Sequence, residues 1–215
     1  LKAKLISEIC AAENLHLKIT EITPNRELID LSDSGFFILR DGPIKVIFNS
    51  SNIEPSYQPG HSHGDTLSLE ASFGEERLIV NSGISTYDDN NKRIFQRSTK
   101  SHSTLEINNK NSSNVWSSFR VAERAKITSR KIEKDDGFEY CVSASHNGYS
   151  RFFNECIHSR KITLNPTSIN IDDAITGKFK TAISRFYIHP NIKLYDADKD
   201  ITLVGKKFRA VIKKK

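Results

Sequence analysis

The sequence predicts an all-β protein, an antiparallel multi-stranded β-sandwich with a short N-terminal helical lead-in. From Ser34 onward, apolar and polar residues alternate with a period of two in many short runs. Turn-forming clusters such as Asp41-Gly42-Pro43 and Asn147-Gly148 separate these runs. The one stretch with a helical pattern lies before them, at about 2–12. Many alternating strands joined by short turns, with almost no helix, are typical of a sandwich.

The first part of the chain differs from the rest. After the helical stretch it is polar, lacks a pattern and contains Pro24. We therefore divide the chain into a lead-in or linker, 1–32, and a β-sandwich domain, 33–215. The chain begins at Leu1 and contains no Met, so we expect it to be a piece of a longer protein with an upstream domain.

Two hairpins are predicted at the start of the sandwich. The runs GFFILR and IKVIFN flank the Asp41-Gly42-Pro43 turn, and TLSLEASF and RLIVN flank Gly74-Glu75-Glu76. Further strands are expected at STLEIN, FRVAERAKITSRKIE, FEYCVSASH, RFFNECIHSRKITL, SINIDDAI, FKTAISRFYIH, ITLVG and KFRAVI. The irregular stretch 82–101 interrupts the pattern, and loops of such length in compact domains are usually functional.

The composition limits the classes of partner. There are 32 Lys and Arg against 26 Asp and Glu, a net charge of +6, and six of the basic residues lie in the last ten. This balance favours an acidic partner, whether nucleic acid, anionic lipid or anionic polysaccharide, although a solvated basic tail explains the terminal lysines equally well. No apolar run reaches the roughly 18 residues of a membrane span, and no signal peptide is visible.

The cysteines give little information on compartment. Cys10, Cys141 and Cys156 are odd in number and have no metal-binding spacing. Cys141 and Cys156 lie in strand-like runs, so we expect buried free thiols there.

One run carries candidate functional residues. If 61–73 is a strand, alternate side chains line one face, and that face carries His61, His63, Asp65, Leu67, Leu69, Ala71 and Phe73. The row therefore leaves the core at its polar end and enters a pocket. The predicted hairpin brings Asn81 back towards His63, and His102 precedes another predicted strand. Two histidines and an oxygen ligand would suit a zinc site with one open position.

Several runs in order resemble the C-terminal domain of the heparinase II/III-like polysaccharide lyases. They are SDSGFFILRDG, YQPGHSHGDTLSLEASFGEERLIVNSGISTY, RSTKSHSTLEIN, WSSFRV, SHNGYSRFFNECIHSRKITL and RFYIHP. The resemblance covers about 33–212. It implies a bacterial, periplasmic or secreted enzyme in which an N-terminal α/α toroid joins this β-sandwich to cleave acidic, uronic-acid-containing polysaccharide such as glycosaminoglycan by β-elimination.

The resemblance also implies roles for individual residues. His61, the first histidine of the His-x-His motif, is expected to face the substrate and be catalytic. His63 and His102 are expected to bind zinc with an acidic residue of a Val-Asp-Ser-Gly motif, but this chain has Asn81 there. Zinc binding is therefore expected to be weakened. Asp65 is expected to orient a histidine from outside the ligand set.

Elimination chemistry requires further groups. A proton must leave the carbon next to the uronate carboxylate, and the charge that develops must be stabilised. Tyr87 and Arg97 could supply a phenol and a cation for substrate binding. Arg93, Trp116 and Arg120 could extend an anion-binding stripe, although Trp116 also fits a packing role. The principal acid tyrosine is expected on the toroid, so this chain would hold half of an active site.

These observations favour one function and leave two alternatives. The leading hypothesis is the C-terminal domain of a lyase, inactive on its own. A non-catalytic carbohydrate-binding or scaffold module would keep the fold without the metal. A nucleic-acid-binding domain is suggested by charge alone and lacks a recognisable motif, so no nucleic-acid partner is expected.

Overall fold

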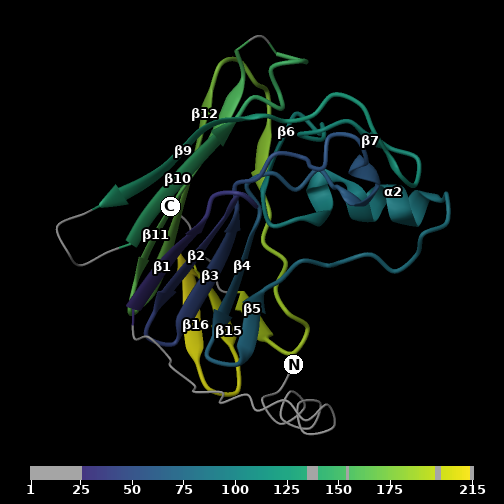
Figure 1. Cartoon of the computed structure of the whole chain (residues 1–215). Coiled ribbons are helices and arrows are strands. Elements are labelled where there is room, and N and C mark those ends of the chain that lie inside the picture. The colour runs from purple at the N-terminus through teal and green to yellow at the C-terminus, as the bar shows by residue number, and fades with distance from the viewer. Residues whose placement is uncertain (1–25, 135–139, 154, 197–199, 214–215) are drawn as a thin grey trace, which may run out of the picture.

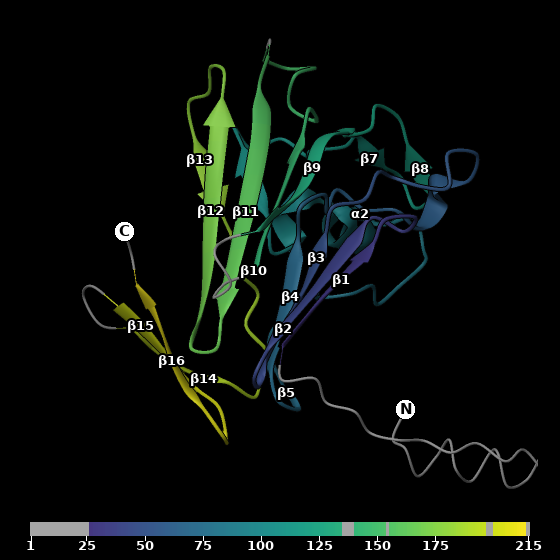
Figure 2. The same ribbon diagram turned by 60° about the vertical axis from the view of Figure 1, so that its left-hand side comes forward.

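The computed structural model describes residues 26–134, 140–153, 155–196 and 200–213. Within them, two antiparallel sheets pack face to face and form the centre of the domain (Figures 1 and 2). The first sheet has the order β1-β2-β3-β4-β5. Its strands are β1 Arg26–Leu31, β2 Phe36–Asp41, β3 Ile44–Asn49, β4 Leu69–Phe73 and β5 Glu76–Ile79.

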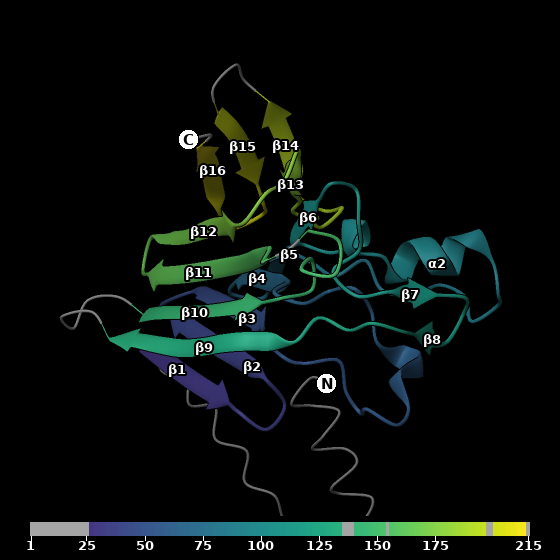
Figure 3. The same cartoon turned by 90° about the horizontal axis from the view of Figure 1, so that it is seen from above.

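The second sheet has the order β12-β11-β10-β9 and covers one face of the first (Figure 3). Its strands are β9 Ile127–Lys134, β10 Tyr140–His146, β11 Ile157–Asn165 and β12 Ser168–Thr176. Side chains of a strand alternate between its two faces, so every second residue points to the other sheet. The core is apolar and comes from both sheets, including Phe37, Leu39, Val46, Phe48, Leu69, Val142, Ala144, Ile162 and Leu164.

Smaller elements complete the domain. They are η1 Pro59–His61, α2 Asn91–Arg97, η2 Thr99–Ser101, β6 Leu105–Ile107, β7 Val115–Trp116, β8 Arg120–Val121, β13 Ala182–Ser184, β14 Lys193–Asp196, β15 Asp200–Val204 and β16 Arg209–Lys213. Strand β13 pairs with β6, β7 with β8, and β14-β15-β16 form a sheet near the turn between β4 and β5 (Figure 1). There Phe208 packs against Phe73, with ring centroids 5.2 Å apart. In the described part of the chain, no helix has the length and hydropathy to cross a bilayer.

The predicted all-β sandwich is confirmed, and both hairpins occur. Asp41 pairs with Ile44 across the first turn, and Phe73 pairs with Glu76 across the second. Gly42 and Gly74 have φ of 55° and 56°, which glycine adopts without the steric cost of a side chain. Cys141 and Cys156 are buried free thiols, as expected, whereas Cys10 and the expected helix at 2–12 lie outside the described residues.

Three local predictions differ from the structure. Strand β1 belongs to the first sheet, so the sheet begins before the expected boundary at 33. The irregular stretch 82–101 contains α2, which the period-two analysis missed. Trp116 is 48% exposed and not part of the core.

The largest difference concerns the run that begins at His61. The strand β4 starts only at Leu69, and Leu67 has φ of 61°, which interrupts an extended backbone. The preceding backbone bonds elsewhere: Gly64 N–H donates to Arg97 O, and Leu67 N–H donates to Asn49 O. The predicted row is therefore correct from Leu69 onward and wrong for 61–68, which form a 3₁₀ turn and a loop.

Candidate functional site

Three connections meet beyond the ends of the two sheets. The first, 50–68, joins β3 to β4 and contains η1; the second, 80–104, joins β5 to β6 and contains α2 and η2; the third, 115–121, holds β7 and β8. Figure 3 shows α2, β7 and β8 together at this end of the molecule. All the residues singled out from the sequence as site candidates lie on these connections.

His61 is exposed and stands among aromatic rings. Its imidazole lies edge-on to Tyr87 and to Phe119, with centroids 6.0 and 6.1 Å away. The Tyr87 and Phe119 rings are parallel within 3° and 6.1 Å apart, and they remain 60% and 45% exposed. Three rings from three connections therefore present one surface to solvent.

The buried Arg93 of α2 packs against two of these rings. Its guanidinium carbon lies 4.8 Å from the Tyr87 ring centroid and 4.5 Å from that of Phe119. It donates hydrogen bonds to the carbonyls of Gly60, Thr86 and Ser118 at 3.4, 3.3 and 2.6 Å. Each carbonyl belongs to the residue directly before one of the three rings. The buried cation thus fixes the backbone on which the rings are mounted.

Arg97, one turn later on the same helix face, plays a similar part. Nε and Nη2 donate to Ser62 O, Nη1 donates to Ser117 O, and Nη2 also reaches Arg120 O. The residue is fully buried. This burial contradicts the expected direct contact of Arg97 with substrate, and likewise an anion-binding stripe built from Arg93. Both guanidiniums are used to join the connections.

His63 and His102 lie side by side. Their ring centroids are 5.1 Å apart and their planes are tilted by 39°. His63 is half-buried and His102 is 1% exposed. Neither ring nitrogen of His102 makes a hydrogen bond of regular distance and angle within the described residues, although the backbone of Gln96 lies close enough to act on the ring. Buried polar atoms are nearly always paired, so a buried imidazole without a regular hydrogen bond is a candidate position for binding a ligand.

Both imidazoles are held neutral at pH 7. Burial lowers the pKa of His102 to about 4. Burial, and then the neighbouring His102, lower the pKa of His63 to about 4, although the Asp65 carboxylate opposes this shift. A neutral imidazole keeps one ring nitrogen as an acceptor, which is the form that takes a proton or binds a metal.

Asp65 lies behind this pair. Its Oδ2 accepts a hydrogen bond from Asn49 Nδ2 at 3.2 Å. Burial raises the pKa of the carboxyl, and the neighbouring His63 counteracts part of that shift. The hydrogen bond from Asn49 anchors Asp65 to the end of β3. The Asp65 carboxyl interacts with the neighbouring His63 imidazole by charge.

Asn81 follows β5 and faces the same region. It lines a cavity of about 190 Å³ together with Asn49, Asp65, Ser68 and Ser103. Its Oδ1 accepts a hydrogen bond from the backbone N–H of Gly83 at 2.9 Å. The amide oxygen is therefore already used to shape the turn after β5.

The residues present fit a zinc ion only in part. The two adjacent imidazoles, with neither His102 nitrogen in a regular hydrogen bond within the described residues, suit a metal. The third expected ligand, Asn81, is neutral and its oxygen is engaged. In the part of the chain that is described, no group of three His, Cys, Asp or Glu side chains is placed to hold a metal ion. The ligand set for zinc is therefore incomplete in the described residues.

Sequence analysis missed the role of Phe119 and the structural use of Arg93. No periodic pattern marks Phe119, because it lies between two very short strands. The four-residue spacing of Arg93 and Arg97 would have placed both on one helix face, had α2 been predicted. Asn90, whose side chain accepts from Arg93 N–H, was the available signal for the helix start.

Comparison with known proteins assigns the chain to a family. The sequence model described as heparinase II/III-like, C-terminal, matches residues 23–211. The chain belongs to this family. No match was found among curated proteins.

Solved structures share the fold of this chain. Heparan sulfate lyase HepC from Pedobacter heparinus superposes with a TM-score of 0.64 at 16% identity, over 87% of this chain and 28% of that one. A heparinase III gene product superposes with a TM-score of 0.66 at 17% identity, over 94% of this chain and 30% of that one. This heparinase II/III-like C-terminal domain therefore spans less than a third of the proteins whose fold it shares.

Proposed function

We propose that this chain is the C-terminal β-sandwich domain of a polysaccharide lyase that cleaves uronic-acid-containing polysaccharide by β-elimination. The observation that carries the proposal is the cluster of His61, Tyr87 and Phe119. In a heparinase II/III-like domain, it presents an exposed imidazole and phenol on a rigid base. Preorganised groups of this kind are what an active site requires.

The chemistry assigns a role to each group. β-Elimination removes the proton next to the uronate carboxylate, breaks the bond to the leaving oxygen and gives an unsaturated sugar. Negative charge grows on the carboxylate as the proton leaves, and the His61 imidazole can donate a hydrogen bond to it. The Tyr87 phenol can bind the same sugar ring while Phe119 packs against its apolar face. The base that accepts this proton and the acid that protonates the leaving oxygen are both proposed to lie on an upstream toroid domain.

Charge supports an acidic substrate. The net charge of +6 favours polyanions. Arg120 is exposed, with its guanidinium carbon 5.4 Å from the Trp116 ring centroid, and adds a cation and an apolar face at the edge of the cluster. The related fold of a heparan sulfate lyase suggests glycosaminoglycan as the first substrate to test. A periplasmic or secreted location in a bacterium is proposed with it.

Zinc is proposed only as a weakly bound structural ion. His63 and His102 would hold it with the amide of Asn81, and it would fix the two imidazoles relative to each other. The poor ligand set also favours a second function, a carbohydrate-binding module without catalysis.

One experiment separates the two functions. The longer parent protein and the 215-residue chain are incubated with heparan sulfate, hyaluronan and alginate, and the unsaturated uronate product is followed by ultraviolet absorbance. We expect turnover of at least one polymer by the parent and none by the chain alone. A parent that binds a polymer but never forms product would overturn the lyase and support the binding module.

A further inference from the structure

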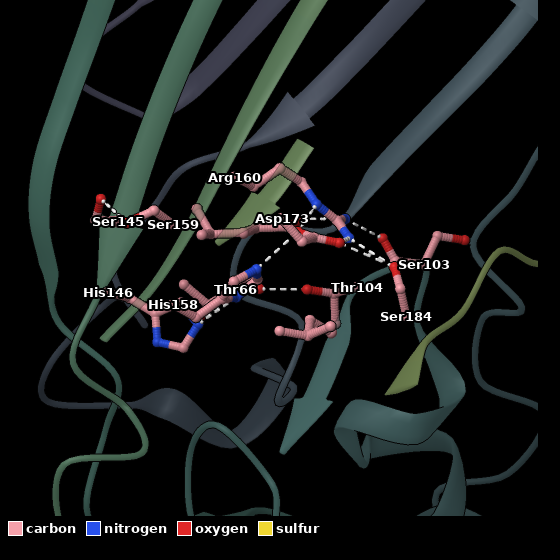
Figure 4. A network of polar contacts seen from close by, with 12 residues as sticks. Thr66, Ser103, Thr104, Ser145, His146, His158, Ser159, Arg160, Asp173 and Ser184 are labelled. Carbon is pink, nitrogen blue, oxygen red and sulfur yellow. Dashed lines mark hydrogen bonds and ion pairs between the residues drawn. The ribbon is translucent and has the colours of Figure 1, made fainter. Parts of the chain in front are cut away.

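A polar network lies buried at the edge of the core, on three strands of the second sheet. His146 of β10 is directly opposite His158 of β11, and Arg160 of β11 is directly opposite Asp173 of β12. Figure 4 shows these side chains between the two layers, with Ser184 beside them. His146, His158 and Arg160 are fully buried. Charged and polar groups at such depth are tolerated only when their hydrogen bonds are complete.

Arg160 satisfies that condition. Nε and Nη2 form a bidentate ion pair with Asp173 at 2.8 and 2.7 Å, and Nη2 also donates to Ser184 Oγ at 3.2 Å. Nη1 donates to Leu67 O at 2.9 Å and to Ser103 O at 2.8 Å. Five N–H groups thus have five acceptor contacts, which a planar guanidinium can make and an ammonium group with three donors cannot.

The two histidines fix the other side of Asp173. Gly148 N–H donates to His146 Nδ1, so in the neutral ring the proton lies on Nε2, which donates to His158 Nδ1 at 3.1 Å. His158 then carries its proton on Nε2 and donates to Asp173 Oδ1 at 2.8 Å. Burial would raise the pKa of Asp173, but hydrogen bonds from His158 and Arg160 outweigh it and hold the carboxyl ionised.

The two carbonyls that Arg160 Nη1 reaches belong to the candidate site. Ser103 directly follows His102, and Leu67 follows His63 by four residues on the loop that replaces the predicted strand. A second contact joins the same segments, since Thr104 Oγ1 donates to Thr66 O at 3.0 Å. The backbone N–H of Leu69 also donates to Ser103 O at 3.3 Å. One guanidinium from the opposite sheet therefore joins the loops that carry the two histidines, together with these two direct contacts.

We propose that Arg160 is a positioning residue for the His63–His102 pair, held in place by Asp173 and the two network histidines. It touches neither imidazole and acts through the backbone of the two loops. Its consequence for turnover rests on the proposed function, whereas its consequence for the geometry of the pair does not. The proposal predicts that a substitution at Arg160 or Asp173 in the second sheet changes the positions of the His63 and His102 rings.

The test uses Arg160→Lys, with Arg130→Lys as the matched control. Arg130 of β9 also joins the sheets, donating to Ser50 Oγ at 2.9 Å and to Phe36 O at 3.1 Å, but it does not contact the Leu67 or Ser103 segments. NMR spectra of the 215-residue chain report the ring signals of His63 and His102 and the dispersion of the amides. We expect the two ring signals to move or broaden in Arg160→Lys and to stay in place in Arg130→Lys.

The parent enzyme gives a second readout. The loop that Arg160 holds through Leu67 O also carries His61. A misplacement of about 1 Å can cost about 100-fold in rate, so we expect kcat to fall at least tenfold in Arg160→Lys with KM changed less than about twofold. Should Arg160→Lys not fold, Asp173→Asn keeps the shape of the ion-pair partner and must perturb the same two ring signals. Unchanged ring signals in a folded Arg160→Lys or Asp173→Asn chain would overturn the proposal. An inactive wild-type parent would instead refute the proposed lyase and leave the NMR result standing.

Discussion

Two pairs of histidines lie in this domain. The distance between the rings is the same in both pairs, but their hydrogen bonding differs. The rings of His146 and His158 are 5.1 Å apart, and so are those of His63 and His102. In the first pair, every ring nitrogen has a hydrogen-bond partner. In the second, neither nitrogen of His102 makes a regular hydrogen bond within the described residues.

The difference teaches how stability and function are divided in this fold. The complete network rigidifies the second sheet and, through Arg160, the loops next to it. The incomplete pair lies at the loop end, beside the exposed His61 cluster, where open donors and acceptors can serve a ligand. Four predictions test this division.

The largest effect is expected for the exposed histidine. His61→Ala in the proposed parent lyase should lower kcat by about 10²–10³-fold, the range for removing one preorganised hydrogen-bond donor to a developing charge. The fold should be unaffected because the side chain is exposed. Steady-state kinetics and thermal melts measure both, with His189→Ala as a control outside the cluster. Turnover within twofold of wild type would remove His61 from the active site.

The two pairs should respond differently to truncation. Asp173→Ala leaves Arg160 and His158 without their buried partner and should cost about 3–5 kcal/mol of unfolding free energy. His102→Leu removes a buried ring whose nitrogens make no regular hydrogen bond in the described residues and should change stability by less than about 1 kcal/mol. Urea unfolding of the 215-residue chain gives both values. Equal losses would erase the distinction between the pairs.

Acid should weaken the domain through the network. Burial, and then the neighbouring His158, lower the pKa of His146 well below 6.5. Below pH 6.5 the unfolded chain therefore binds a proton that the folded chain does not, and stability present at pH 7 is lost as the pH falls. One such group contributes a slope of about 1.4 kcal/mol per pH unit.

The matched variant is His146→Gln, which cannot be protonated. Urea melts between pH 6 and 5 should show a slope shallower by about 1.4 kcal/mol per pH unit than in the wild type, because the unfolded ring is mostly protonated there. A slope identical to that of the wild type would show that His146 is protonated in the folded chain.

The smallest effect concerns the metal. Asn81→Asp adds a negative charge next to the cavity that Asp65 also lines and should raise zinc affinity by about 10-fold. Calorimetric titration of both chains measures it, with Asn91→Asp, at an exposed position of α2, as a control for added charge alone. An equal gain in the control would show that Asn81 is not a ligand.

The sequence by itself determined the fold class. Alternation and turn residues are local signals, so they placed the hairpins at Gly42 and Gly74 and the inward row that begins at Leu69. They also marked the run that contains His61 and His63. The resemblance named His102 as their companion, and the structure places it next to His63.

Only the tertiary structure decided how the site is built. The run 61–68 is not a strand because its backbone bonds to the last residues of α2 and β3, which no local period reveals. Arg93, Arg97 and Arg160 have the sequence character of exposed cations, yet all three are buried. Burial of a guanidinium requires carbonyls or carboxylates arranged around it, and here these come from segments far apart in the chain. Such convergence exists only once the sheets and loops have packed, so the sequence could name the histidines but not the arginines that hold them.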